Sequence, residues 1–227
     1  PALDEYNNNT AWWADVTHNW NTVVNGGISN GALAVADESS ALESLAGELL
    51  ELALAHVQKV LPSLAPDGGG EEGTGYWRYN MEYYVNFVSS LQSALGDDYG
   101  MTDAPGLAET AYFPIIAAGP KGSFNYGDNY TEVIRNPIFF WFAEQFDNDD
   151  FAKHRMAQLT ATVSPAPAHE LDLLWYRPGI SAPYTPDLEL DGWFEGIDVG
   201  AMRSAWNDPN ALFVAFKGGS NQFNHSH

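Results

Sequence analysis

Two histidines near the end of the sequence are the first candidates for chemistry. They belong to the segment Asn224-His225-Ser226-His227, where one residue separates them. Histidine transfers protons near neutral pH and binds metal ions. In a strand, residues two positions apart point to the same face, so both rings can approach one site. Taken alone, such a pair more often has no special role.

Residues 71–79, Glu-Glu-Gly-Thr-Gly-Tyr-Trp-Arg-Tyr, are the second candidate, at a predicted boundary between a loop and a helix. Such boundaries present side chains to clefts. Tyr76 is close in sequence to Arg78, and a neighbouring cation stabilises a phenolate and lowers the pKa of tyrosine. A tyrosine of this kind can act as acid or base. The simpler interpretation is that the aromatic side chains pack the start of the helix.

The third candidate is the segment His18-Asn19-Trp20-Asn21. It combines imidazole and amide donors with a large apolar ring, and such groups can bind a carboxylate or sugar hydroxyls. The alternative interpretation gives the asparagines a capping or turn role.

Carboxylate pairs, as used by glycoside hydrolases, are a weaker signal. Because the chain has 30 acidic residues, some pair is always available. There is no Gly-x-Ser-x-Gly motif and no phosphate-binding glycine loop with a lysine. The acids considered for such a pair are Glu71, Glu72, Asp128, Glu170 and Asp172.

The composition limits the class of protein. Nine basic residues against 30 acidic ones give a net charge of −21, which argues against a nucleic-acid groove and against an anionic membrane surface. With 45% hydrophobic residues the 227-residue chain can bury a substantial core. The absence of cysteine excludes disulfides and thiolate metal sites. No apolar run is long enough to span a membrane.

The elements that must position these groups are predicted to be mainly helices. The clearest helix covers residues 39–60, with Ser39 or Ser40 as its cap and Pro62 beyond its end. The residues at helical spacing on one face are Leu42, Leu45, Leu49, Leu52 and His56. Residues 10–37 form an apolar segment interrupted by Gly26, Gly27 and Gly31, which indicates close packing against a neighbour. Further helices are predicted at 79–95, at 107–118 with a bend at Pro114, and at 131–146, 150–160 and 168–176.

The pattern changes after residue 178, where prolines mark a linker and apolar segments at 193–202 and 211–216 are typical of strands. We therefore expect a helical domain at residues 1–178, arranged as helical hairpins. Residues 179–227 are expected to open a β domain. Because so few strands make a poor sheet, we expect this domain to be truncated here.

Three features in this order resemble the heparinase II/III-like polysaccharide lyases, a group that includes the oligoalginate lyases. They are Asn19-Trp20 at the opening of a helical segment, the glycine-rich residues 67–76 ending in Tyr76, and the strand leading into residues 224–227. The resemblance covers residues 12–227, and the terminal Asn-His-Ser-His pattern is its most specific part. It implies an incomplete (α/α) toroid, lacking its N-terminal part here, followed by the first strands of an antiparallel β-sandwich.

The resemblance implies β-elimination in a uronic-acid-containing glycan, either alginate-like or a glycosaminoglycan. A base removes the proton next to the carboxylate while the glycosidic oxygen leaves, and this requires that the carboxylate charge be offset. Asn19 is expected to donate hydrogen bonds to that carboxylate, whereas Tyr76 and His225 are expected to serve as acid and base. The residues expected to contact substrate are His18, Trp20, Glu72, Arg78 and Tyr79.

His227 corresponds to a zinc ligand of the resembling family. The remaining ligands would lie beyond this chain, and one histidine does not hold zinc, so we expect a structural zinc ion in the intact protein and not in this segment. The expected partner is an anionic polysaccharide or oligosaccharide, with no nucleic acid and no membrane insertion, in a periplasmic or secreted protein. The few basic residues favour an unsulfated uronate.

Two other functions stay open at this point. One is a carbohydrate-binding fragment without catalysis. The other is a glycoside hydrolase on a helical toroid, using two carboxylates.

Overall fold

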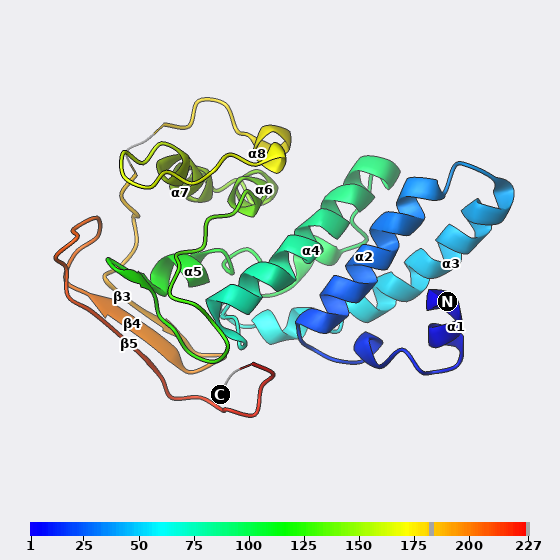
Figure 1. The fold of residues 1–227 in the computed structure, drawn as a ribbon, viewed down its shortest axis with the longest axis horizontal. Helices are drawn as coiled ribbons and strands as arrows, with labels where there is room; N and C mark the ends of the chain where they lie inside the picture. The colour runs from blue at the N-terminus through cyan, green and yellow to red at the C-terminus, as the bar shows by residue number, and fades with distance from the viewer. Residues whose placement is uncertain (182–183, 226–227) are drawn as a thin grey trace.

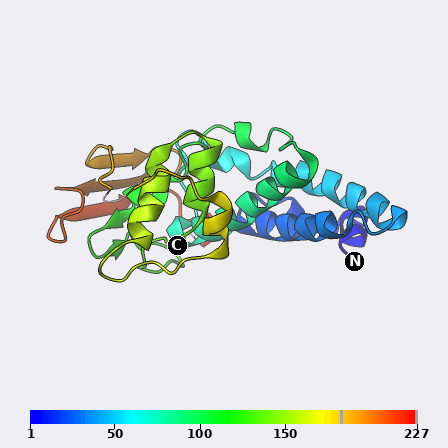
Figure 2. The same ribbon diagram turned by 90° about the horizontal axis from the view of Figure 1, so that it is seen from above.

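The computed structural model describes residues 1–181 and 184–225. The fold is mainly helical, with a small three-stranded antiparallel sheet near the C-terminal end (Figure 1). Seen from above, the molecule is elongated, with α2 and α3 toward one end and the sheet at the other (Figure 2). The α-helices are α1 (Ala2–Asn7), α2 (Asn19–Val35), α3 (Ser40–Val57), α4 (Gly73–Leu95), α5 (Tyr112–Ile116), α6 (Ile138–Gln145), α7 (Asp149–Leu159) and α8 (Glu170–Trp175). The short 3-10 helices are η1 (Trp12–Ala14), η2 (Leu61–Leu64) and η3 (Met101–Asp103).

Helices α2, α3 and α4 form one layer, in which α2 packs against both of the others (Figure 1). Ser39 caps α3 as predicted, because its hydroxyl accepts a hydrogen bond from the Leu42 N–H at 3.3 Å. The predicted apolar face of α3 is confirmed in part, because Leu49 and Leu52 pack against the hydrophobic clusters. Leu45 is 40% exposed, and the buried face consists of Ala46, Leu50, Ala53 and Val57.

The glycines of α2 lie within the helix and do not end it. A Cβ atom added at Gly26 would lie 3.2 Å from the Tyr83 carbonyl oxygen of α4, so the predicted close packing is confirmed there. Added at Gly27 or Gly31, it would meet nothing within 4 Å. For these two glycines the close-packing prediction is wrong.

Helix α4 begins at Gly73, earlier than the predicted start at residue 79. Glycines obscured this start because they disfavour helices intrinsically. Gly73 has φ +86°, and a Cβ at Gly75 would collide with the side chain of Asn129. The first turn of α4 therefore needs glycine to accept the neighbouring loop. The helix ends as predicted, with Gly96 as a left-handed C-cap.

Two other predicted helices are shorter than expected. Helix α6 starts after Pro137 rather than at residue 131, since proline disfavours the helical conformation in the residue before it. Helix α5 covers only the later part of 107–118, and Pro114 falls in its first turn, where a missing N–H costs little. The predictions for α7 and α8 are confirmed to within about two residues at each end.

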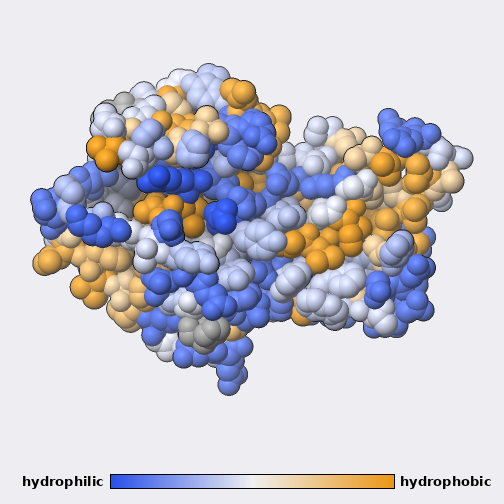
Figure 3. Space-filling view, viewed as in Figure 1, coloured by the Kyte–Doolittle hydropathy of each residue, from blue (hydrophilic) through white to orange (hydrophobic). Residues whose placement is uncertain are grey.

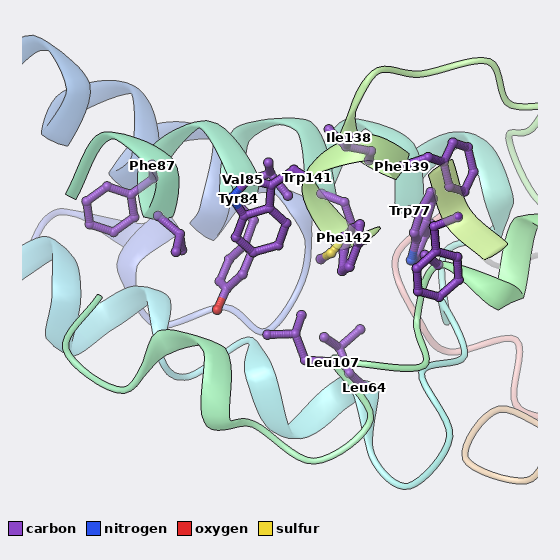
Figure 4. Close-up of a cluster of buried hydrophobic side chains, with 14 of the residues drawn as sticks. Leu64, Trp77, Tyr84, Val85, Phe87, Leu107, Ile138, Phe139, Trp141 and Phe142 are labelled. Atoms are coloured by element: carbon purple, nitrogen blue, oxygen red, sulfur yellow. The ribbon is translucent and has the colours of Figure 1, made fainter. Parts of the chain in front are cut away.

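The main hydrophobic core lies where α6 packs against α4, and it is rich in aromatic rings (Figure 4). Each such ring stabilises the fold by roughly 1.5–3 kcal/mol on burial. Helix α8 is held to α7 by a buried ion pair in which Arg155 donates to both oxygens of Asp172, at 2.8 and 2.7 Å. Core residues visible in Figure 4 include Leu64, Trp77, Tyr84, Phe139 and Phe142.

The sheet consists of β3 (Asp191–Phe194), β4 (Val199–Arg203) and β5 (Phe213–Lys217), antiparallel in that order. The strand prediction for 193–202 is confirmed, and this segment forms most of the β3–β4 hairpin with the turn at residues 195–198. The second predicted strand is confirmed as β5. A separate small hairpin pairs β1 (Ala118–Gly119) with β2 (Gly122–Ser123). Within the described residues, no helix is long and apolar enough to cross a membrane.

Large apolar side chains are exposed on the outer face of the sheet, and hydrophobic surface gathers over this region at the lower left of Figure 3. They are Trp193, Met202, Val214 and Phe216. On the inner face of the sheet, the side chains of Phe194, Val199 and Ala201 are buried.

The glycines of α2 make a matched stability test. Gly27→Ala should raise the free energy of unfolding by about 0.5–1 kcal/mol, because glycine inside a helix costs that much relative to alanine. Gly26→Ala should instead lower it, because the added methyl group presses on the Tyr83 carbonyl. Urea unfolding of the two variants measures the difference. Equal gains in both would contradict the close contact between α2 and α4.

Candidate functional site

The carboxylate of Glu72 joins three distant segments of the chain. Glu72 is the N-cap residue of α4 and only 5% exposed. One carboxylate oxygen accepts a hydrogen bond from the backbone N–H of Asn19 at 2.9 Å, across 53 positions of sequence. The other accepts from the side-chain amide of Asn224 at 3.0 Å, across 152 positions. The starts of α2 and α4 therefore meet the C-terminal segment at this carboxylate (Figure 1).

Burial raises the pKa of Glu72 above its ordinary value. The hydrogen bonds from Asn19 and Asn224, together with the nearby imidazoles of His18 and His225, act in the opposite direction. Both carboxylate oxygens already have protein donors. A direct contact between Glu72 and a substrate stays a prediction.

The start of α2 holds polar atoms that lack partners. Asn19 is 2% exposed, and its side-chain oxygen is buried without a hydrogen bond to any described residue. The same is true of Nδ1 of His18, the N-cap residue. Buried polar atoms normally have partners, and the N-terminus of a 17-residue helix favours anions. The Glu72 carboxylate already accepts from the Asn19 N–H at this helix end, and the Asn19 side-chain oxygen is left to accept a hydrogen bond from a donor group.

The rings of Tyr76 and His225 are stacked on each other. Their centroids are 3.7 Å apart, and the angle between their planes is 6°. His225 Nδ1 lies 2.7 Å from an Asp128 carboxylate oxygen, and the Asp128 N–H donates to the His225 carbonyl at 3.2 Å. The structure thus brings together two predicted catalytic residues from opposite ends of the sequence. The link to Asp128 was missed, because nothing in the sequence pairs residue 128 with residue 225.

The charge around Tyr76 differs from the prediction. Its pKa is raised, first by burial and then by the negative charges of Asp128 and Glu72. The expectation that Arg78 lowers the pKa of Tyr76 is wrong. Arg78 instead donates to Glu82, one turn further along α4, at 3.3 Å. Tyr76 is therefore a protonated phenol at neutral pH.

An open cleft of about 630 Å³ lies against the first turns of α4. This volume is in the range of ligand-binding sites. Of the predicted site residues, Tyr76, Arg78 and Tyr79 line it, together with the loop residues Asp128 and Tyr130. Trp20 is not among its described lining residues and packs on Trp12, with ring centroids 5.5 Å apart.

Of the five acids considered for a hydrolase pair, Asp128 is the one among the described lining residues of this cleft. Asp172 is committed to the buried ion pair with Arg155, and the Glu170 side chain is largely exposed. Glu71 lines a space of only about 20 Å³, too small for a sugar ring. Glu72 and Asp128 are the two considered acids that lie near Tyr76.

The predicted metal ligand His227 lies outside the described residues. Within residues 1–181 and 184–225, no group of three or more histidine, aspartate or glutamate side chains is placed to hold a metal ion. Comparison of the sequence with protein-family models and with curated proteins found no match.

Glu71 makes a pH-dependent contribution to stability. Burial, with a smaller effect of Glu72, raises its pKa from 4.5 to about 7. The folded state therefore holds this proton more tightly than the unfolded state, and stability is lost as pH rises from 4.5 to about 7. Glu71→Gln mimics the protonated acid. It should raise the free energy of unfolding above pH 7 by roughly 1–3 kcal/mol and change it little at pH 4.5.

Urea unfolding at the two pH values tests this prediction. Glu48→Gln, on the exposed side of α3, is the matched control and should change stability little at either pH. A gain from Glu71→Gln that is the same at both pH values would show that proton binding is not its cause.

Proposed function

We propose that this protein is a polysaccharide lyase that cleaves a uronic-acid-containing glycan by β-elimination. The observation that carries the proposal is the stacked pair of Tyr76 and His225 beside an open cleft, with His225 bonded to Asp128. Glu72 ties the same region to Asn19. Asn19, Tyr76 and His225 belong to the segments through which the sequence resembles the heparinase II/III-like lyases.

His225 is proposed as the base. An ionised Asp128 carboxylate can accept hydrogen bonds but cannot donate them. The proton in its contact with His225 is therefore on the Nδ1 atom of His225. This leaves Nε2 with a free lone pair, the tautomer a general base needs. Asp128 would also stabilise the imidazolium that forms when the base accepts a proton.

Tyr76 is proposed as the acid, because its raised pKa keeps the phenol protonated. In the reaction, the bond between the proton and the carbon next to the carboxylate breaks, and its electrons form a carbon–carbon double bond. The bond from the neighbouring carbon to the glycosidic oxygen breaks at the same time. His225 takes the first proton, and Tyr76 supplies the proton that the leaving oxygen needs.

Asn19 is proposed to offset the substrate carboxylate. Abstraction of the proton places further negative charge on that group, which acidic surroundings would oppose. The side chain of Asn19 is buried at the positive end of the α2 dipole. Its unpartnered oxygen is an acceptor, so the proposed role requires the side-chain NH2 group of Asn19 to face the substrate carboxylate. Its amide is a neutral donor, so it adds no charge next to the acidic residues.

The substrate is proposed to be an alginate-like or other unsulfated uronate. Arg78 is the cation among the described lining residues of the cleft, and it already pairs with Glu82. Sulfate groups are usually bound by several arginines or lysines. Because such polymers occur outside the cytoplasm, the proposal includes a periplasmic or secreted location. A toroid of helical hairpins and a structural zinc ion through His227 belong to the same proposal, and no reaction step uses the metal.

Tyr76→Phe should reduce lyase turnover by roughly 100-fold or more, because removing a general acid costs that much. Turnover is followed by the ultraviolet absorbance of the unsaturated product, with alginate, hyaluronan, chondroitin and heparan sulfate as substrates. Tyr99→Phe is the matched control, since Tyr99 is an exposed tyrosine in the turn after α4. It should retain wild-type turnover.

The same assay separates the alternatives. New reducing ends without the absorbance would indicate a glycoside hydrolase. Binding of a polymer without either product would indicate a carbohydrate-binding protein without catalysis. Turnover that survives in Tyr76→Phe would refute the assigned role of Tyr76.

A further inference from the structure

A second cavity lies apart from the cleft at Tyr76. Its volume is about 440 Å³, and it is an open pocket lined by α7, the segment at residues 184–186 and the residues that follow β4. It shares no described lining residue with the cleft. In Figure 3, strongly hydrophilic surface surrounds a hollowed region between the α7 side of the molecule and the sheet.

Arg203 of β4 is a buried cation at this cavity, with its guanidinium stacked 3.7 Å from the centroid of the Trp206 ring. Asp191 acts on it electrostatically, but among the described residues no carboxylate oxygen forms an ion pair with it. It is 8% exposed, and burial lowers its pKa to about 10. Its terminal nitrogens donate to the carbonyls of Ala118, at 2.9 Å, and Ile116. Its Nε is buried and finds no acceptor in the described chain. Buried charges are normally paired, so a bound anion would complete this environment.

Tyr184 and His154 are neutral donors among the residues that line the same cavity. Tyr184 is 7% exposed, and its hydroxyl has no hydrogen-bond partner among the described residues. Gln158 donates its side-chain N–H groups to Nε2 of His154 and to the Ile134 carbonyl, both at 2.8 Å. His154 must therefore carry its proton on Nδ1. Burial lowers the pKa of His154 to about 4, so at neutral pH its ring is a neutral donor.

The rest of the lining is partly apolar and includes Ile115, Ala157 and Pro186. Two arginines line the cavity, the buried Arg203 and the exposed Arg135, and Asp208 opposes part of their charge. The partly apolar lining favours an organic anion over inorganic phosphate, which has no apolar body.

We infer that this cavity binds a small organic carboxylate with an apolar body, with the carboxylate at Arg203 and Tyr184. The carboxylate would accept hydrogen bonds from the Arg203 Nε and the Tyr184 hydroxyl, and its apolar body would contact Ala157 and Pro186. This inference is independent of the proposed lyase activity.

Isothermal titration calorimetry with benzoate tests the inference. Benzamide, which has the same shape without the charge, and inorganic phosphate, which has charge without an apolar body, are the comparison ligands. The wild-type protein should bind benzoate at least roughly tenfold more tightly than either, since a hydrogen bond to a charged group contributes that much. Tyr184→Phe should weaken benzoate binding roughly tenfold, and Ala157→Met should weaken it by filling the apolar wall.

Tyr76→Phe alters the separate cleft and should leave the benzoate Kd unchanged. Circular dichroism and thermal unfolding establish that each variant folds. Equal affinity for benzoate and benzamide, tighter binding of phosphate, or an unchanged Kd in a folded Tyr184→Phe or Ala157→Met protein would overturn the inference. Loss of benzoate binding in Tyr76→Phe would place the ligand in the cleft and overturn it as well.

Discussion

The arrangement of the candidate site depends on one buried carboxylate. Removing a carboxylate from water costs several kcal/mol unless hydrogen bonds replace its hydration. For Glu72, the hydrogen bonds from Asn19 and Asn224 to its two carboxylate oxygens offset this cost. The same contacts that satisfy the carboxylate therefore bring the starts of α2 and α4 to the C-terminal segment. One turn further along α4, Tyr76 then lies where it can stack on His225.

The contacts of Glu72 with Asn19 and Asn224 form what we call the Glu72 bridge. The negative charges around it also determine which proposed residue acts as acid and which as base. Burial, together with the charges of Asp128 and Glu72, raises the pKa of Tyr76 and disfavours a phenolate. Asp128 in turn holds His225 in the tautomer of a base. The nearby acids repel the carboxylate of the proposed substrate. In the proposal, the Asn19 amide and the positive end of the α2 dipole offset this repulsion. The acidic site and the proposed unsulfated substrate are thus consistent with each other.

The sequence predicted those features that local chemistry determines. Ser39 as the cap of α3, Gly96 as the end of α4, and the extents of α7 and α8 follow from residue types and spacing. It failed where distant contacts override local preference. The early start of α4 depends on glycines that accept residues near Asn129, and Arg78 turns to Glu82 instead of Tyr76. The bond between His225 and Asp128 spans 97 positions and leaves no local pattern.

The most direct test of this account is the nuclear magnetic resonance signal of the His225 ring, assigned with a His225→Gln variant. Stacking on Tyr76 should shift the His225 ring protons upfield, and Tyr76→Leu should remove that shift. If the Glu72 bridge positions the C-terminal segment, Glu72→Ala should remove most of the shift while Tyr76 is still present. An upfield shift that persists undiminished in folded Glu72→Ala would contradict the account.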